Sequence, residues 1–257
     1  MQLGTFAYVS PPGKFHPAVF QDNLRKFPAR YPLVLYSDHK YDGMIPVGNP
    51  EQARRGGKKW AVNNLIFFTA MRIAKQQGYT HIIYIEQDSR VGCQDWDEMI
   101  FDEFFASGKA AVMGGSMVIY NPCNGNPVAA KRWEEVVRRN RRKNIPIPTY
   151  GWKGGADNSG SCIFSNGSLS VLDVQAISEL FDLNKTIQTS ALSGAWDMEI
   201  GLRLWREFEE NSYFMVSHLD RMFSSYGNVL TTEEYRLNML RNNEVVAIHQ
   251  VKSDAQP

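Results

Sequence analysis

Residues 81–89 read HIIYIEQDS, an apolar stretch followed at once by two carboxylates and an amide. A short apolar run of this kind is typical of a strand buried on both faces of a parallel sheet. Upstream, apolar runs at 3–9 and 32–36 alternate with helical patterns at 18–27 and 58–77. This alternation predicts an α/β fold, Rossmann-like in its first half, with a mixed, mostly parallel central sheet flanked by helices.

The rest of the chain continues the alternation around one segment of different composition. Residues 121–160 contain four prolines and the run KRWEEVVRRNRRKN, and we expect an insertion with one polar helix. After it, SCIFSNGSLSVL at 161–172 predicts a strand and a turn, and 196–211 predicts a strong amphipathic helix. Helices are also expected at 95–108, 173–181 and 232–241, and strands at 110–114, 213–216 and 244–253. No linker is visible, so the sequence predicts one domain, 1–257, with a basic insertion at about 121–160.

Composition excludes several classes of protein. The 257 residues carry 28 Lys and Arg against 27 Asp and Glu, which argues against a surface that attracts nucleic acid or membranes everywhere. Three cysteines without a CxxC pair favour free thiols over a disulfide framework or a zinc cluster. The first residues lack a signal-peptide pattern and no apolar run approaches membrane-spanning length, so we expect a soluble, cytoplasmic protein without membrane insertion. No protein partner is evident from the sequence.

Glu86 and Asp88 are the most informative polar residues because they end an apolar strand. In open α/β sheets, ligands bind at the carboxyl ends of the strands. Paired carboxylates at such an edge suit Mg²⁺ or Mn²⁺, which commonly recruit substrate phosphates. The pairs Asp95/Asp97 and Glu207/Glu209 show the same spacing, but we expect them on exposed helix faces.

Three further places offer polar groups, each with a simpler explanation. Asp197 and Glu199 stand at a predicted helix start, where acids also favour the helix dipole. His249 follows the apolar run VVAI, with Lys252 three residues on, and together they offer an imidazole for a metal and a cation for a phosphate. Loop residues after the first two strands could contact a nucleoside or only form turns: Tyr8, Ser10, Ser37 and Asp38.

Taken in order, these motifs resemble those of the GT-A fold glycosyltransferases that use nucleotide-sugars, along the whole chain. The carrying features are the strand ending in EQD, the SNGSLSV turn, the DMEIGLR helix and the C-terminal HQVK. The resemblance implies a single GT-A domain in which a DxD-like motif and a C-terminal His hold Mn²⁺ or Mg²⁺. It also implies a carboxylate base at a helix start and a small-residue turn that shapes the donor and acceptor pocket.

Carried over residue by residue, the resemblance implies that Asp88 and His249 bind the metal and that Glu86 faces the ribose or the metal. Asp197 stands where the catalytic base is expected, with Glu199 grouped as a second catalytic candidate, and Trp196 replaces the first acid of the usual pair. The implied nucleotide-sugar contacts are Tyr8, Ser10, Ser37, Asp38, Glu86, Gln87 and Lys252; the implied acceptor contacts are Asn166, Gly167 and Trp196.

The basic run leaves two interpretations open. Between Lys131 and Lys143, basic residues exceed acidic ones by five, which fits a solvated helix face. It also fits a surface for a polyanionic acceptor, a nucleic acid or an acidic glycan, with Arg138 and Arg142 as contacts. Trp133 and Trp152 nearby could stack on sugars or bases.

The sequence therefore predicts a metal-dependent transferase (EC 2.4 class) that moves a sugar from a UDP-sugar to an acceptor hydroxyl, by inversion with Asp197 as base. A nucleotidyltransferase of related fold should carry a Gly- and Arg-rich phosphate loop after the first strand, and YVSPPGKF lacks one. A non-catalytic nucleic-acid-binding protein would explain the arginine run but not Asp88 and His249. A GT-A relative without activity is the third alternative, because Trp196 is atypical.

Overall fold

Two sheets organise the computed structural model. It describes residues 1–11, 17–47, 61–106, 112–120, 162–181, 183, 196–197, 200, 216–218, 223–224, 232–249 and 251. Within them, a seven-stranded sheet has the order β3-β2-β1-β4-β7-β6-β8, and a three-stranded sheet has the order β5-β10-β9. The large sheet contains β1 (Leu3–Tyr8), β2 (Leu33–Ser37), β3 (Ile45–Pro46), β4 (His81–Glu86), β6 (Met113–Tyr120), β7 (Cys162–Asp173) and β8 (Val216–His218). The small sheet contains β5 (Arg90–Val91), β9 (Phe223–Ser224) and β10 (Ala247–Ile248).

The large sheet is mixed and mostly parallel, as predicted. Strand β7 runs antiparallel to its neighbours β4 and β6, whereas the other adjacent pairs are parallel. Tyr8 is level with Tyr36 on one side and with Glu86 on the other, so β1, β2 and β4 end at the same edge. Loops after these three strands are therefore brought together, which is where open α/β sheets bind ligands.

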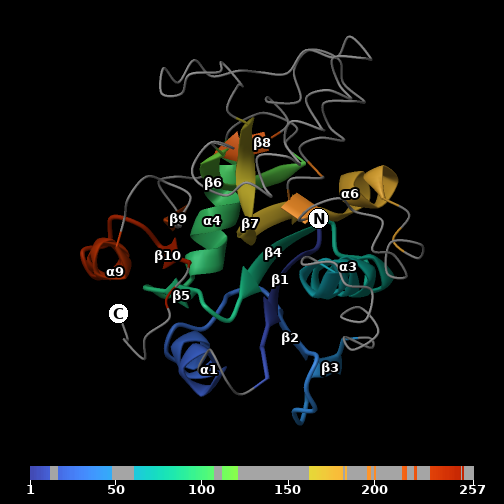
Figure 1. Ribbon diagram of the computed structural model, residues 1–257, viewed down its shortest axis with the longest axis horizontal. Helices are drawn as coiled ribbons and strands as arrows, with labels where there is room; N and C mark the ends of the chain where they lie inside the picture. Colours follow the sequence, from blue (N-terminus) through green and yellow to red (C-terminus); the bar gives the residue numbers. More distant parts are fainter. Residues whose placement is uncertain are drawn as a thin grey trace.

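Helices cover both faces of this sheet (Figure 1). They are α1 (Pro17–Lys26), α3 (Ala61–Gln76), α4 (Trp96–Ala106) and α6 (Val174–Leu180), whereas α9 (Glu233–Arg241) packs against β10 of the small sheet. In β4, Ile82 and Tyr84 pack in a core with α3 and α6, while Ile83 and Ile85 pack in a second core with α1 and α4. Because alternate strand residues point to opposite faces, four consecutive apolar residues fill both cores. In the described ranges, no helix combines the length and the apolar character that a bilayer crossing requires.

The turn predicted within 161–172 is wrong. From Cys162 to Asp173 the chain is one strand, in which residues 162–165 and 170–172 pair with β6 and residues 169–173 pair with β4. The small polar residues fall at a register shift, where Gly115 lies opposite Ser170 but Met117 lies opposite Ser165. Extra residues of β7 are thus accommodated as a bulge, which small residues tolerate. The insertion expected at 121–160 lies outside the described residues.

The expectation that Asp97 lies on an exposed helix face is also wrong. Its side chain is fully buried in the first turn of α4. Its Oδ1 accepts a hydrogen bond from the Arg30 amide at 2.8 Å, and its Oδ2 accepts one from the Tyr31 amide at 2.9 Å. The segment between α1 and β2 crosses this helix start, and its part-buried amides find their acceptors there. Asp97 therefore joins α4 to the entrance of β2.

Replacing this carboxylate should destabilise the fold. Asp97→Asn presents an NH₂ group to one of the two amides, and we expect the free energy of unfolding to fall by about 1–3 kcal/mol. Urea denaturation measures the change, with the exposed Asp95→Asn as the matched control, expected within about 0.5 kcal/mol of the unsubstituted protein. Equal stability of the two variants would show that the Asp97 bonds contribute nothing.

Candidate functional site

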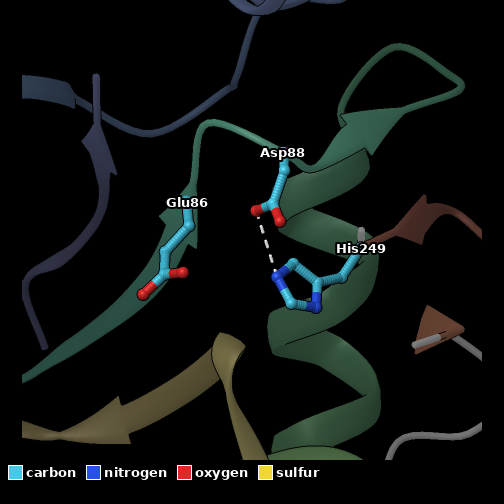
Figure 2. A group of neighbouring side chains, drawn as sticks. All are labelled: Glu86, Asp88 and His249. Atoms are coloured by element: carbon cyan, nitrogen blue, oxygen red, sulfur yellow. Dashed lines mark ion pairs between the residues drawn. The ribbon is translucent and has the colours of Figure 1, made fainter. Parts of the chain in front are cut away.

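Three potential metal ligands gather at the carboxyl edge of the large sheet. Glu86 ends β4, Asp88 lies in the loop that follows, and His249 follows β10. Their ligand atoms all lie within 4.8 Å of one another, and Figure 2 shows the side chains turned toward a common space. The structure thus brings together the two predicted metal ligands and Glu86.

The small sheet joins these distant parts of the chain. Antiparallel pairing of β5 with β10 sets Ile248 opposite Arg90, so the next residue, His249, lies beside the loop that carries Asp88. Two backbone bonds complete the junction: the Val251 amide donates to the Asp88 carbonyl at 2.8 Å, and the Gly92 amide donates to the Val246 carbonyl at 3.1 Å. The C-terminal strand is therefore fixed to the acidic loop by its backbone.

Asp88 and His249 form a buried ion pair. His249 Nε2 lies 3.1 Å from Asp88 Oδ1 (Figure 2), and only 4% of His249 and 8% of Asp88 are exposed. Burial lowers the pKa of His249, but the charges of Asp88 and Glu86 outweigh it and raise that pKa above its usual value. Burial raises the pKa of Asp88, but His249 and then Arg90 outweigh it and lower that pKa. Without a metal, the carboxylate and the imidazolium therefore hold each other charged.

The donor set fits a divalent cation. Two carboxylates and an imidazole suit Mn²⁺, while Mg²⁺ prefers the oxygen ligands. Neighbouring ligands of an octahedral ion with bonds of about 2.1 Å lie about 3.0 Å apart, close to the 3.1 Å between Asp88 Oδ1 and His249 Nε2. Glu86 is already oriented, because the buried Tyr84 hydroxyl donates to its Oε1 at 3.1 Å. Binding would displace the proton that His249 otherwise carries.

The residues predicted to bind the nucleoside lie at the same edge. The Tyr8 hydroxyl donates to Asp38 Oδ1 at 2.8 Å, joining the ends of β1 and β2. The fully buried Ser37 hydroxyl donates to the Val9 carbonyl and accepts from the His39 amide, which fits the alternative of a turn former. Ser10 is buried, and its hydroxyl donates to the Pro11 carbonyl. Gln87 is 8% exposed, and its Oε1 makes no hydrogen bond within the described ranges.

Trp196 is packed in the core next to Asp197. Its ring stacks on Phe67 of α3, with centroids 3.7 Å apart and planes 6° from parallel, and meets Tyr84 edge to face. Only 3% of Trp196 is exposed, whereas Asp197 is half-buried. These contacts give Trp196 a packing role, and they anchor the chain directly before Asp197. The acceptor contact expected of Trp196 stays a prediction.

The remaining predicted site residues are placed only in part. Asn166 and Gly167 lie in β7 at its register shift with β6. Glu199, Lys252, Arg138 and Arg142 lie outside the described residues.

Sequence reasoning missed two groups that act on the site. Tyr84 orients Glu86, and its place two residues earlier on the same strand face was the available signal. Arg90 is 2% exposed beside the acidic loop, and an arginine two residues after Asp88 was the signal for it. Both are buried polar groups close to a charged cluster, which is where functional positioning residues are expected.

The ion pair predicts a pH-dependent cost for His249→Gln in metal-free protein. The raised pKa of His249 gives stability that is complete below pH 6.5 and lost as the pH rises through that pKa. The lowered pKa of Asp88 gives stability that is complete above pH 3.8 and lost as the pH falls through that pKa. We expect the free energy of unfolding of the variant to be lower by about 3–5 kcal/mol between about pH 4 and 6.5, and by less near pH 9. Urea denaturation in EDTA measures this, and a cost independent of pH would contradict the charged pair.

A solved glycosyltransferase shares this architecture. The galactosyltransferase LgtC, solved in complex with donor and acceptor sugar analogs, matches with a TM-score of 0.51 at 10% identity, over 96% of this chain and 86% of that chain. Apo mouse xyloside xylosyltransferase 1 matches with a TM-score of 0.48 at 13% identity, over 100% of both chains. A glycosyltransferase involved in glycosylation of the major capsid of PBCV-1 matches with a TM-score of 0.48 at 8% identity, over 99% of this chain and 96% of that chain.

No protein-family model and no curated protein matches the sequence. Its sheet topology and its likeness to LgtC show that this chain has the GT-A fold that its sequence resembles.

Proposed function

We propose that this protein is a metal-dependent glycosyltransferase that moves a sugar from a nucleoside diphosphate sugar, a UDP-sugar by preference, to an acceptor hydroxyl. The carrying observation is the cluster of Glu86, Asp88 and His249 at the carboxyl edge of a GT-A sheet. LgtC, which shares the fold, was solved with donor and acceptor sugar analogs, and this supports a sugar donor here as well. The cytoplasmic location expected from the sequence stays a prediction.

On the donor side, Asp88 and His249 would hold Mn²⁺ or Mg²⁺, with Glu86 as a further ligand or as the ribose contact. A bound ion supplies positive charge that stabilises a departing diphosphate. Lys252 would add a second cation on the diphosphate. The nucleoside would lie against the ends of β1 and β2, beside Gln87. Residues expected to line that part of the site are Tyr8, Ser10, Ser37 and Asp38.

On the acceptor side, Asp197 would accept the proton of the attacking hydroxyl, with Glu199 as a second carboxylate in the same motif. Direct attack by that hydroxyl on the anomeric carbon breaks the bond to the diphosphate and inverts the configuration. Stacking of Trp196 on Phe67 supports this role, because it anchors the chain directly before the proposed base. Asn166 and Gly167, at the β7 bulge, would contribute to the acceptor pocket.

The donor proposal predicts stabilisation by a nucleotide that depends on metal and on Asp88. At concentrations about 100-fold above Kd, UDP with Mn²⁺ should raise the Tm by about 5–10 °C, and EDTA should remove the shift. Asp88→Asn should lose the shift, while Glu98→Gln, a surface carboxylate paired with Arg30, should keep it.

A thermal-shift panel of UDP, GDP, CDP and their sugars, each with Mn²⁺ or EDTA, provides the measurement. Stabilisation by none of the nucleotides would overturn the donor proposal. Release of pyrophosphate from a nucleoside triphosphate would instead favour a nucleotidyltransferase.

Asp197→Asn should separate binding from turnover. The variant keeps the size of the side chain but removes the base, so we expect donor affinity within about twofold of the unsubstituted protein and transfer slowed by about 100-fold or more. Product formation with an acceptor panel and NMR of the anomeric configuration provide the measurement. Full turnover, or a product of retained configuration, would refute the role of Asp197 as base.

The basic run 131–143 supports a polyanionic acceptor, a nucleic acid or an acidic glycan, with Arg138 and Arg142 among the contacts. Affinity for single-stranded RNA, DNA or heparin should then fall by at least about tenfold between roughly 50 and 200 mM salt, because salt weakens contacts to the polyanion. The double variant Arg138→Ala, Arg142→Ala should flatten this dependence. Fluorescence anisotropy measures it, and a flat response of the unsubstituted protein would remove the polyanion hypothesis.

A further inference from the structure

Arg90 lies where the acidic loop enters the small sheet. It opens β5, pairs with Ile248 and is therefore adjacent across the sheet to the residue before His249. Its side chain is 2% exposed. It is one of the largest fully buried side chains, and the others of that size are aromatic. Burying a guanidinium is costly unless its donors are used and its charge is compensated. Such a placement therefore needs a local reason.

The backbone carbonyls of the loop supply that reason. Arg90 Nη1 donates to the Gln87 carbonyl at 3.3 Å and to the Ser89 carbonyl at 2.7 Å. The carbonyl between them, that of Asp88, accepts from the Val251 amide at 2.8 Å, and the Glu86 carbonyl accepts from the Ser89 amide at 2.9 Å. All four carbonyls of the loop are thus bonded, two of them by one guanidinium group. The Arg90 side chain therefore ties together the carbonyls on either side of Asp88.

The charge of Arg90 acts in the same direction as its bonds. Burial raises the pKa of Asp88, and the positive charges of His249 and Arg90 lower it. A metal bound by His249 would displace the proton of that imidazole, whereas Arg90 would keep its positive charge next to the loop. A guanidinium cannot be deprotonated in proteins, whereas a buried lysine readily is.

We propose that Arg90 is a positioning residue of the metal site, which holds the loop of residues 86–89 in the conformation that directs Asp88 toward His249. The inference rests on the proposed metal-dependent function, because it assigns Arg90 a role in the same site. It identifies the source of preorganisation at Asp88, a residue that ordinary loop flexibility would otherwise misplace.

The test compares Arg90→Lys with Asp97→Asn, using Mn²⁺ alone as the probe. Lysine keeps the positive charge but ends about one bond short of Nη1, so it cannot reach both carbonyls. We expect the Kd for Mn²⁺, measured by isothermal titration calorimetry, to rise by about 10–100-fold in Arg90→Lys, as for other groups that orient metal ligands. Asp97→Asn, which removes bonds outside the loop, should lower the Tm yet leave the Kd within about twofold.

A second measurement does not depend on metal. Amide hydrogen exchange in EDTA follows the Ser89 and Val251 amides, which donate within the loop and to it, and the Gly92 amide, which donates to Val246. Arg90→Lys should speed exchange of the first two by about tenfold or more relative to Gly92, while Asp97→Asn should change all three alike.

The outcomes separate the two claims. Unchanged Mn²⁺ affinity and unchanged relative exchange in Arg90→Lys would overturn the role of Arg90. Equal losses of affinity in both variants would also overturn it, since they would reflect general destabilisation. Failure of the unsubstituted protein to bind Mn²⁺ would overturn the metal site itself, and the exchange data alone would then decide whether Arg90 orders the loop.

Discussion

The contact between Asp88 Oδ1 and His249 Nε2, at 3.1 Å, is the interaction on which the site depends. Each charge is buried, and leaving either one without the other would cost several kcal/mol, on the order of 3–5. The pair therefore requires that the loop after β4 and the strand near the C-terminus be held together. Pairing of β5 with β10, and the bond from the Val251 amide to the Asp88 carbonyl, meet that requirement. A site made from residues 88 and 249, which lie far apart in the sequence, can thus form only in the folded protein.

The two helical layers position the rest of the site. Because β1, β2 and β4 end level, Tyr8 and Glu86 lie at the same edge, where polar groups follow strands that pack in the two cores. Tyr84 belongs to one core by its ring and to the site by its hydroxyl, which bonds Glu86. The same ring meets Trp196, which precedes Asp197. An aromatic contact therefore joins the proposed donor side to the proposed base, and it explains why a bulky residue is accommodated at position 196.

Sequence patterns predicted the parts of this structure that local composition determines. Apolar runs located β1, β2 and β4 to within a residue or two, and the strand end of β4 identified Glu86 and Asp88. They failed where pairing at long range decides the outcome. The pattern at 161–172 predicts a turn inside what is one strand, β7, and no pattern indicates that Asp97 is buried, because the amides that Asp97 binds belong to a distant segment. The contact of Asp88 with His249 depends on the pairing of β5 with β10; the predicted strand at 244–253 contains β10, but no pattern predicted the two-residue β5 or the burial of Arg90. Sequence could name ligands, but only the fold could bring them together.

The central claim is that Asp88 and His249 share one divalent cation that receives a nucleoside diphosphate. Anomalous X-ray scattering from a crystal grown with Mn²⁺ and UDP tests it most directly. The account predicts one strong Mn²⁺ peak about 2.0–2.3 Å from an Asp88 carboxylate oxygen and from His249 Nε2, with phosphate oxygens of UDP completing the coordination. A map with no peak between these residues, or with Mn²⁺ bound elsewhere and the 3.1 Å ion pair intact, would contradict it.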